Sequence, residues 1–487
     1  MTRLTFDFGV GNQRSAAPRG ERASALSETG ATRVLVIADL RGDSREPAAT
    51  LERARLTAID VDNFERVFAE LGPQLSLNFS SPALRGGSGG ERRLRFESLE
   101  DFHPDRLYDA LDLAELRRRP AQPRTAATAE DDASTLGRLL GAKPSAPAAP
   151  RVSSGIDQLV HELVSPHIVR GPDPEQSQLM ASGDAAIGDE LRRVLHAPAF
   201  QRLEASWRAL RWLVCESALG ADLSVSVLDA TREELLADLR ACRGELERSQ
   251  LYRLIVREQV GGPDPRPFSL IIGDLSIAGS EEDVSLLAGL GALAAQAGGC
   301  FLAAAEPPLW GANDLAREPD RSRWSAPDSE VAARMALLRA SAVAPFIGLC
   351  MPRVLGRVPY GQRSEPIERF DFDELPEDPA HDQFLWLNPA FACAQLILAG
   401  VAERGWERGP GSQLDLADLP QAAYRASGRD AYKPCAEVFL DESSAEQALG
   451  YGLMPLLSYR NRNAVRLLRL QSIASPAAAL ALGGEHA

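Results

Sequence analysis

The stretch from residue 267 to residue 307 constrains the fold most, because it joins two short apolar runs through one long helical pattern. Residues 267–274, PFSLIIGD, and residues 300–307, CFLAAAEP, are typical of strands that are buried on both faces. The segment between them, SEEDVSLLAGLGALAAQAGG, has the length and apolar content of a helix. A strand, a helix and a strand in this order predict a βαβ unit with two parallel strands, and therefore an α/β fold.

The same kinds of pattern predict further strands and helices on both sides of this unit. Thr231 followed by Glu234 is a capping box, which predicts that a helix begins there. Asp60 or Asp62 can cap a helix over residues 64–71, where apolar residues recur at helical spacing. The other predicted elements are strands at 32–40, 75–80, 94–98, 223–229 and 345–361, a core helix at 200–214, and a strand, a short helix and a basic strand after residue 434.

The composition changes between residues 120 and 153, where proline, alanine and serine dominate. Such a composition is typical of a linker, and one short helical pattern at 133–141 interrupts it. We therefore predict a small mixed α/β domain at 1–119, a linker at 120–153 and a larger α/β domain with parallel βαβ units at 154–487.

Residues 95–111, RFESLEDFHPDRLYDAL, concentrate side chains of types that bind metals or move protons: Glu97, Glu100, Asp101, His103 and Asp105. The stretch also has the features of a helix start, because Pro104 stands at a first helical turn with acidic residues around it. In that interpretation Asp101 or His103 caps the backbone and Phe102 packs beneath the helix. We favour the structural interpretation, with an exposed helix face left to meet the larger domain or a neighbour.

Asp39 and Asp274 are the best candidates for catalysis, because each ends a predicted strand, where open α/β sheets bind ligands. Neither strand is followed by a glycine-rich turn that could hold a phosphate, and Gly289 and Gly291 lie inside a predicted helix. The motifs GxxxxGK[ST] and HExxH do not occur. We therefore predict no enzyme, no cofactor and no metal ion.

Charge and cysteine content restrict the class of protein further. A formal net charge of −15 opposes binding to nucleic acid, which needs a basic surface. The six cysteines are scattered singly without a CxxC pair, as is typical of a reduced, cytoplasmic protein. We expect no membrane insertion, because no run of about 18 apolar residues occurs and the N-terminus lacks the apolar core of a signal peptide.

Two stretches of the first part resemble a known family. AIDVDNFERVFAELGPQLSLNF, from residue 58, and FESLEDFHPDRLYDAL, from residue 96, are similar to the small sheath subunit of the type VI secretion system, TssB or VipA. RVLVIADLRG and RLTFDFGVG resemble strands of the same family, with Ala38 where that family has glycine.

The second part resembles the large sheath subunit, TssC or VipB, in five blocks that follow the family's order. The blocks are LHAPAFQRLEASWRALRWLV, LIIGDLSIAGSEEDVSLLAGLGALAAQAGGCFLAAAEP, APFIGLCMPRVLGRVPYG with ERFDFDE, QFLWLNPAFACA, and AEVFLDESSAEQALGYGLMPLLSYRNRNAVRLLRLQS. The chain departs from the family in two respects: both subunits are fused, and the large subunit's usual C-terminal portion is expected to be missing after the LQS segment.

The resemblance implies a structural role in a contractile secretion machine. Sheath protomers of this family assemble around an inner tube, meet baseplate components and drive injection by contraction in the cytoplasm. A fused protomer that forms homo-oligomers is therefore expected. The alternative is a non-polymerising accessory or adaptor protein derived from the sheath, which the shortened C-terminal portion suggests.

Three groups of residues are candidates for contacts with partners. Strands exchanged between copies are expected at Leu4, Phe6 and Phe8 and at Val465, Leu467 and Arg469, because an added strand satisfies open backbone groups at a sheet edge. By resemblance, the short helix with Leu136, Leu139 and Leu140 is a candidate for recognition by the AAA+ unfoldase ClpV, and a helix that packs on its own domain is the alternative.

Overall fold

The computed structural model describes residues 32–45, 51–78, 91–114, 174–217, 223–406, 411 and 414–482 of the 487-residue chain. The predicted strand with Leu4, Phe6 and Phe8 and the predicted helix with Leu136, Leu139 and Leu140 lie outside the described residues. The linker predicted at 120–153 also lies outside them, so the three domain boundaries stay predictions.

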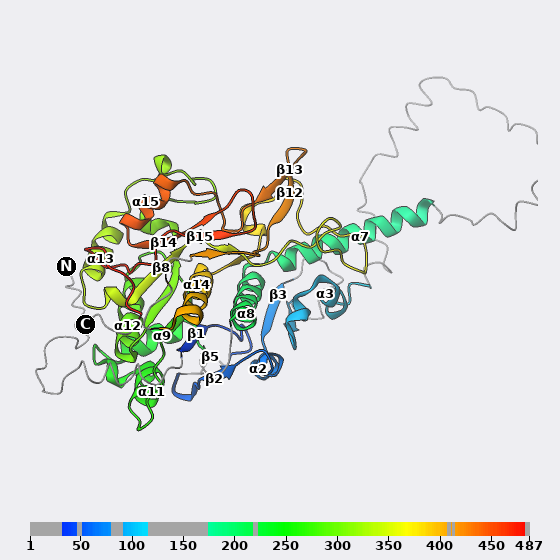
Figure 1. Ribbon diagram of the computed structural model, residues 1–487. Helices are drawn as coiled ribbons and strands as arrows, with labels where there is room; N and C mark the ends of the chain where they lie inside the picture. The colour runs from blue at the N-terminus through cyan, green and yellow to red at the C-terminus, as the bar shows by residue number, and fades with distance from the viewer. Residues whose placement is uncertain are drawn as a thin grey trace, which may run out of the picture.

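One large sheet forms the centre of the molecule (Figure 1). Among the described residues its nine strands lie in the order β11 (Asp415–Leu416), β15 (Val465–Leu467), β14 (Leu453–Ser458), β8 (Ile347–Met351), β7 (Cys300–Ala305), β6 (Leu270–Ile277), β1 (Thr32–Ala38), β5 (Leu223–Asp229) and β2 (Thr57–Ile59). The central strands are parallel, whereas β15 and β2 run antiparallel to their neighbours. This mostly parallel sheet confirms the predicted α/β class.

Strand β1 lies inside this sheet, third from the β2 edge, although it is far from its neighbours in sequence. It pairs in parallel with β5 on one side and with β6 on the other. Val34 and Val36 face one hydrophobic core, while Leu35 and Ile37 face the other. A strand that is apolar on both faces needs a layer of side chains on each side. Because β5 and β6 belong to the C-terminal part of the chain, the N-terminal part shares one sheet and both cores with it.

Helices cover both faces of the sheet and account for the two cores. On one face lie α9 (Arg232–Ala241), α12 (Glu281–Ala297) and α13 (Ser329–Arg339), and on the other lie α8 (Pro198–Glu216) and α14 (Pro389–Arg404). The predicted capping box of Thr231 and Glu234 opens α9, and β6, α12 and β7 form the predicted βαβ unit. Gly289 and Gly291 permit close packing of α12, since a Cβ atom there would meet Leu239 or Ile347 within 3 Å.

Smaller elements surround the sheet. They are α2 (Phe64–Leu71), β3 (Gln74–Asn78), β4 (Glu91–Arg95), α3 (Pro104–Ala110), α7 (Pro174–Leu195), α10 (Gln250–Tyr252), α11 (Glu258–Val260), β9 (Val354–Leu355), β10 (Trp386–Leu387), β12 (Ala422–Ala426), β13 (Arg429–Lys433) and α15 (Glu442–Gly450). Strands β3 and β4, β9 and β10, and β12 and β13 form three two-stranded sheets. Figure 1 shows α7 reaching outward from the body of the molecule.

Two local predictions were wrong. Helix α2 takes Asn63 as its N-cap rather than Asp60 or Asp62, because the Asp60 carboxylate accepts the backbone N–H of Asn63 at 2.8 Å and closes a turn before the helix. After residue 434 the chain forms no strand before α15, and the apolar run 453–458 forms β14 instead.

Candidate functional site

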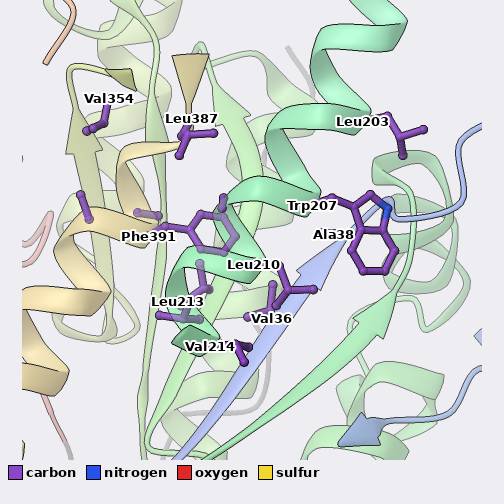
Figure 2. Close-up of a cluster of buried hydrophobic side chains, with 14 of the residues drawn as sticks. Val36, Ala38, Leu203, Trp207, Leu210, Leu213, Val214, Val354, Leu387 and Phe391 are labelled. Atoms are coloured by element: carbon purple, nitrogen blue, oxygen red, sulfur yellow. The ribbon is translucent and has the colours of Figure 1, made fainter. Parts of the chain in front are cut away.

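The contact between the N-terminal segment (residues 32–114) and the C-terminal segment (residues 174–482) is centred on Trp207 of α8. Its side chain is fully buried, and the indole Nε1 donates a hydrogen bond to the carbonyl oxygen of Leu40 at 3.0 Å. The ring lies 4.3 Å from that of Phe68 and 5.7 Å from that of Phe64. Figure 2 shows Trp207 and other α8 side chains beside β1 of the N-terminal segment, so α8 of the C-terminal segment packs directly on the N-terminal segment.

A second aromatic cluster continues this contact. Phe96 and Phe102 of the N-terminal segment stack at 4.3 Å, and Phe200 of α8 meets Phe102 edge-on at 5.3 Å. All three rings are buried. Aromatic pairs of this geometry stabilise by about 0.5–1.5 kcal/mol beyond their buried area. Phe102, which the sequence placed beneath a helix start, therefore packs against the other segment as well.

The FHPD sequence begins α3, as its proline suggests. Pro104 is the first residue of the helix, and His103 is its N-cap, with the ring Nδ1 accepting the backbone N–H of Asp105 at 3.2 Å. Asp101 caps the preceding turn instead, by accepting the backbone N–H groups of Glu97 and Ser98. The Asp101 carboxylate is thus engaged with backbone groups. In the described ranges no three His, Cys, Asp or Glu side chains are arranged to hold a metal ion.

Two carboxylates of α3 contact the C-terminal segment. Asp105 accepts the backbone N–H groups of Glu368 at 3.0 Å and of Arg369 at 3.3 Å. Asp109 forms a 2.5 Å ion pair with the Arg369 guanidinium. This part of the 95–111 stretch therefore fastens one segment to the other within the same chain.

Replacing Asp105 by alanine is expected to lower the free energy of unfolding by about 1–3 kcal/mol, because two backbone donors lose a charged acceptor. Urea denaturation at neutral pH measures the change. Glu70→Ala is the matched control, since the Glu70 carboxylate is exposed and pairs with Arg66 on the surface of α2. Equal effects of the two variants would contradict the role given to Asp105.

A buried network of charges adjoins this contact. The Arg357 guanidinium lies 2.8 Å from the Glu204 carboxylate and 2.7 Å from the Glu374 carboxylate, and all three side chains are almost completely buried. Arg208 pairs with Glu204 at 2.7 Å. The Tyr360 ring, over which Arg357 lies, meets the His103 ring of the N-terminal segment at 4.8 Å. The network therefore supports the face of the C-terminal segment on which α3 rests.

The pKa values in the network follow from these contacts. Burial alone would raise the pKa of Glu374, but the Arg357 charge, the nearby His196 ring and hydrogen bonds from Arg357 and the Tyr360 backbone lower it to about 2. Burial would lower the pKa of Arg357, whereas its two glutamates raise it. These groups therefore stay charged in the folded protein. Sequence patterns did not predict this network, although one signal was available: Glu204 interrupts the apolar stripe of α8.

Of the two catalytic candidates, Asp39 follows the end of β1 as predicted, whereas Asp274 does not end its strand but lies within β6, which continues to Ile277. Both residues belong to structural contacts. Asp274 accepts the hydroxyl of Ser206, and burial raises its pKa. Asp39 accepts the backbone N–H of Gly42 and lies 3.3 Å from Arg45, which also pairs with Asp229. An ion pair between the two segments therefore lies where β1 and β5 end, with Arg45 from the N-terminal segment and Asp229 from the C-terminal segment.

The described strand among the exchange candidates is already paired. Val465 and Leu467 of β15 are fully buried, and β15 lies between β14 and β11. Arg469 follows the strand and is exposed. Exchange between copies at these residues stays a prediction. Of the helices that the structure describes, each is too short or too polar to traverse a lipid bilayer.

Comparisons with known proteins match both segments. Residues 177–474 match the family model of the VipB (EvpB) tail sheath N-terminal domain, and residues 31–119 match that of the type VI secretion system protein VipA. The sheath protein TssC1 of Pseudomonas aeruginosa is 29% identical over 309 residues, which cover 61% of this chain and 61% of TssC1. The sheath protein TssB1 of the same organism is 35% identical over 69 residues, which cover 14% of this chain and 40% of TssB1.

These matches follow the division that the contacts describe. The chain spans about three fifths of the length of TssC1 and two fifths of that of TssB1. The two family matches leave residues 120–176 between them. The chain therefore belongs to the tail sheath family of VipB, and it carries a VipA-type segment of the type VI secretion system in the same polypeptide.

Proposed function

We propose that this chain is the protomer of a contractile type VI secretion sheath, which assembles around an inner tube and drives effector injection by contraction. The observation that carries the proposal is that VipA-type and VipB-type segments lie in one polypeptide and share a sheet and an aromatic core. A close-packed interior transmits strain with little compression, which suits a part that must move as a rigid body.

Fusion of the two segments has a physical consequence for assembly. It sets their ratio at one to one and raises the effective concentration of each for the other. Since β1 fills the gap between β5 and β6, a protomer is complete only when both segments are present. One polypeptide supplies both for every position in a lattice.

The proposed partners are copies of the chain, the inner tube protein, baseplate components and, at Leu136, Leu139 and Leu140, the unfoldase ClpV, all in the cytoplasm. Copies would join by strand addition at sheet edges. In the described sheet, β2 and β11 are the edge strands, and β11 contributes two residues. Exchange at Val465 and Leu467 would displace this short strand, whereas Leu4, Phe6 and Phe8 would supply a strand of their own.

Negative-stain electron microscopy of the full chain, alone and co-expressed with a tube protein, tests the proposal. Tubes or rings are the expected result, because the chain contains both sheath segments. Small monodisperse particles under both conditions would overturn the proposal and favour an accessory or adaptor protein derived from the sheath. A variant with a disrupted core, Val36→Asp, is the control that must not assemble.

A further inference from the structure

A surface pocket of about 200 Å³ lies beside α13 and has no role in the contacts described above. Its walls are almost entirely apolar and include Leu309, Val331, Met335, Tyr451 and Leu453. Small-molecule sites usually measure about 300–1,000 Å³, so this pocket suits one or two aliphatic side chains better than a cofactor. An apolar anchor seated in such a pocket is typical of contacts between proteins.

One cation stands at this α13 pocket. The Arg339 guanidinium contributes to the lining and donates hydrogen bonds to the carbonyl oxygens of Ile473 at 2.8 Å and Gly450 at 3.1 Å. Among the described residues no carboxylate lies within 4.0 Å of it, and burial lowers its pKa. A half-buried cation without a counter-charge favours binding of a segment that carries a carboxylate next to an apolar side chain.

One exposed turn of the same chain has this chemistry. Among the residues that the structure describes, the most exposed large apolar side chains are Val61, Met180, Leu337 and Tyr432, and Leu337 belongs to α13 itself. Val61 is 55% exposed and lies between Asp60 and Asp62, both exposed, whereas Tyr432 is followed by Lys433 and Met180 has no adjacent acid. In the described ranges no cation lies within 4.0 Å of Asp60 or Asp62, so the Asp-Val-Asp turn (residues 60–62) combines an exposed apolar side chain with negative charge, the complement of an apolar pocket with one cation.

The turn and the pocket cannot meet within one molecule. The turn follows β2, the strand at one edge of the sheet, whereas the pocket adjoins β14 near the other edge. Figure 1 shows β2 and α2 on the opposite side of the molecule from α13 and α15. Two different surfaces that fit each other on separate copies form a head-to-tail contact, which extends into a ring or a helical filament.

We infer that the Asp-Val-Asp turn of one copy docks into the α13 pocket of a second copy, with Val61 against the apolar walls and a flanking aspartate beside Arg339. This inference rests on the proposed function, since it assigns a contact by which sheath protomers join. The contact needs no strand exchange and no further protein. Because its rim is ionic, association weakens as the salt concentration rises.

Cross-linking tests the contact directly. Val61→Cys and Ala336→Cys chains, both also carrying Cys215→Ser to remove the exposed native thiol, are mixed and treated with a short bismaleimide linker. A covalent dimer is expected, and it should be absent for the matched mixture of Val61→Cys with Tyr432→Cys, which places a thiol on an exposed residue away from the pocket. Equal yields from the two mixtures would overturn the inference.

A mixing experiment separates this contact from assembly in general. Val61→Asp and Ala336→Glu each change an exposed residue and should each weaken self-association by at least about tenfold, which corresponds to about 1.4 kcal/mol. Mixed together they should form a one-to-one dimer in sedimentation velocity, because each keeps the surface that the other lacks. Tubes without the cross-link would refute the docking contact alone, whereas the cross-link without tubes would refute only the sheath proposal.

Discussion

Replacing Trp207 by alanine is expected to lower the free energy of unfolding by about 5 kcal/mol. Removal of a fully buried tryptophan typically costs about 3–5 kcal/mol through lost transfer energy and the cavity that remains. The Leu40 carbonyl also loses its donor, the indole Nε1, and an unpaired buried polar group adds about 1–3 kcal/mol. Guanidinium denaturation followed by circular dichroism measures the change.

Two further variants identify the cause. Trp207→Phe keeps an aromatic ring against Phe68 and removes the hydrogen bond, so about half of the loss is expected. Trp212→Ala, on the same helix, removes a partly buried ring and should cost about 1–2 kcal/mol. If Trp212→Ala destabilised the protein as much as Trp207→Ala, the contact between the segments would not be centred on Trp207.

Limited proteolysis relates this stability to the architecture. Because Trp207 holds Phe64 and Phe68 of the N-terminal segment, the alanine variant should expose that segment to protease earlier than the C-terminal segment. Loss of both segments at the same rate would indicate that the shared sheet unfolds as one cooperative unit.

Local patterns were sufficient to predict most elements of the sheet. The runs predicted as strands at 267–274 and 300–307 contribute β6 and β7, which form the expected βαβ unit with the helix between them, because each pattern has a periodicity that one backbone geometry satisfies. Thr231 and Glu234 form their capping box for the same local reason. Pro104 begins α3, since proline lacks only a backbone donor that the first helical turn leaves unpaired.

Long-range pairing was much less predictable. The position of β1 between β5 and β6 depends on contacts between distant segments, which no local period encodes. A signal existed in residues 32–38, whose side chains are apolar on both faces, because such a strand needs a layer on each side. A small separate domain with few helices could not supply two layers, so this run already indicated a sheet shared with the larger part.

The candidate site shows the same limit. A cap at Asp101 or His103 followed from the position before Pro104, and the structure selects His103. The hydrogen bonds that Asp105 accepts from Glu368 and Arg369 depend on a segment without regular structure. Glu204 was recognisable as an acid within an apolar helix face. Its partner Arg357 was not, since it lies beyond a short strand where no helical or strand period fixes the direction of a side chain.

Replacing Arg357 by methionine is expected to lower the free energy of unfolding at pH 7 by about 3–5 kcal/mol. Methionine keeps much of the volume but leaves Glu204 and Glu374 buried without the shared guanidinium, and an uncompensated buried charge has this cost. Arg363→Met is the matched control, because its pair with Asp430 is exposed on both sides and should contribute less than about 1 kcal/mol. Urea denaturation compares the two variants.

The pH dependence distinguishes lost charge pairing from lost packing. In the wild-type protein the pKa of Glu374 falls from its ordinary 4.5 to about 2, so its ionised form contributes roughly 3 kcal/mol of stability that is present above pH 4.5 and lost as the pH falls towards 2. In the Arg357→Met variant burial dominates and raises this pKa, so the carboxyl group protonates readily in acid. The difference in stability between wild type and variant should therefore shrink between pH 7 and pH 3.

Adding Glu374→Gln to the variant should recover part of the loss at pH 7, because the glutamine removes one buried charge that has lost its partner. A difference that stays constant with pH, and that the glutamine does not reduce, would show that Arg357 acts through its packing rather than its charge.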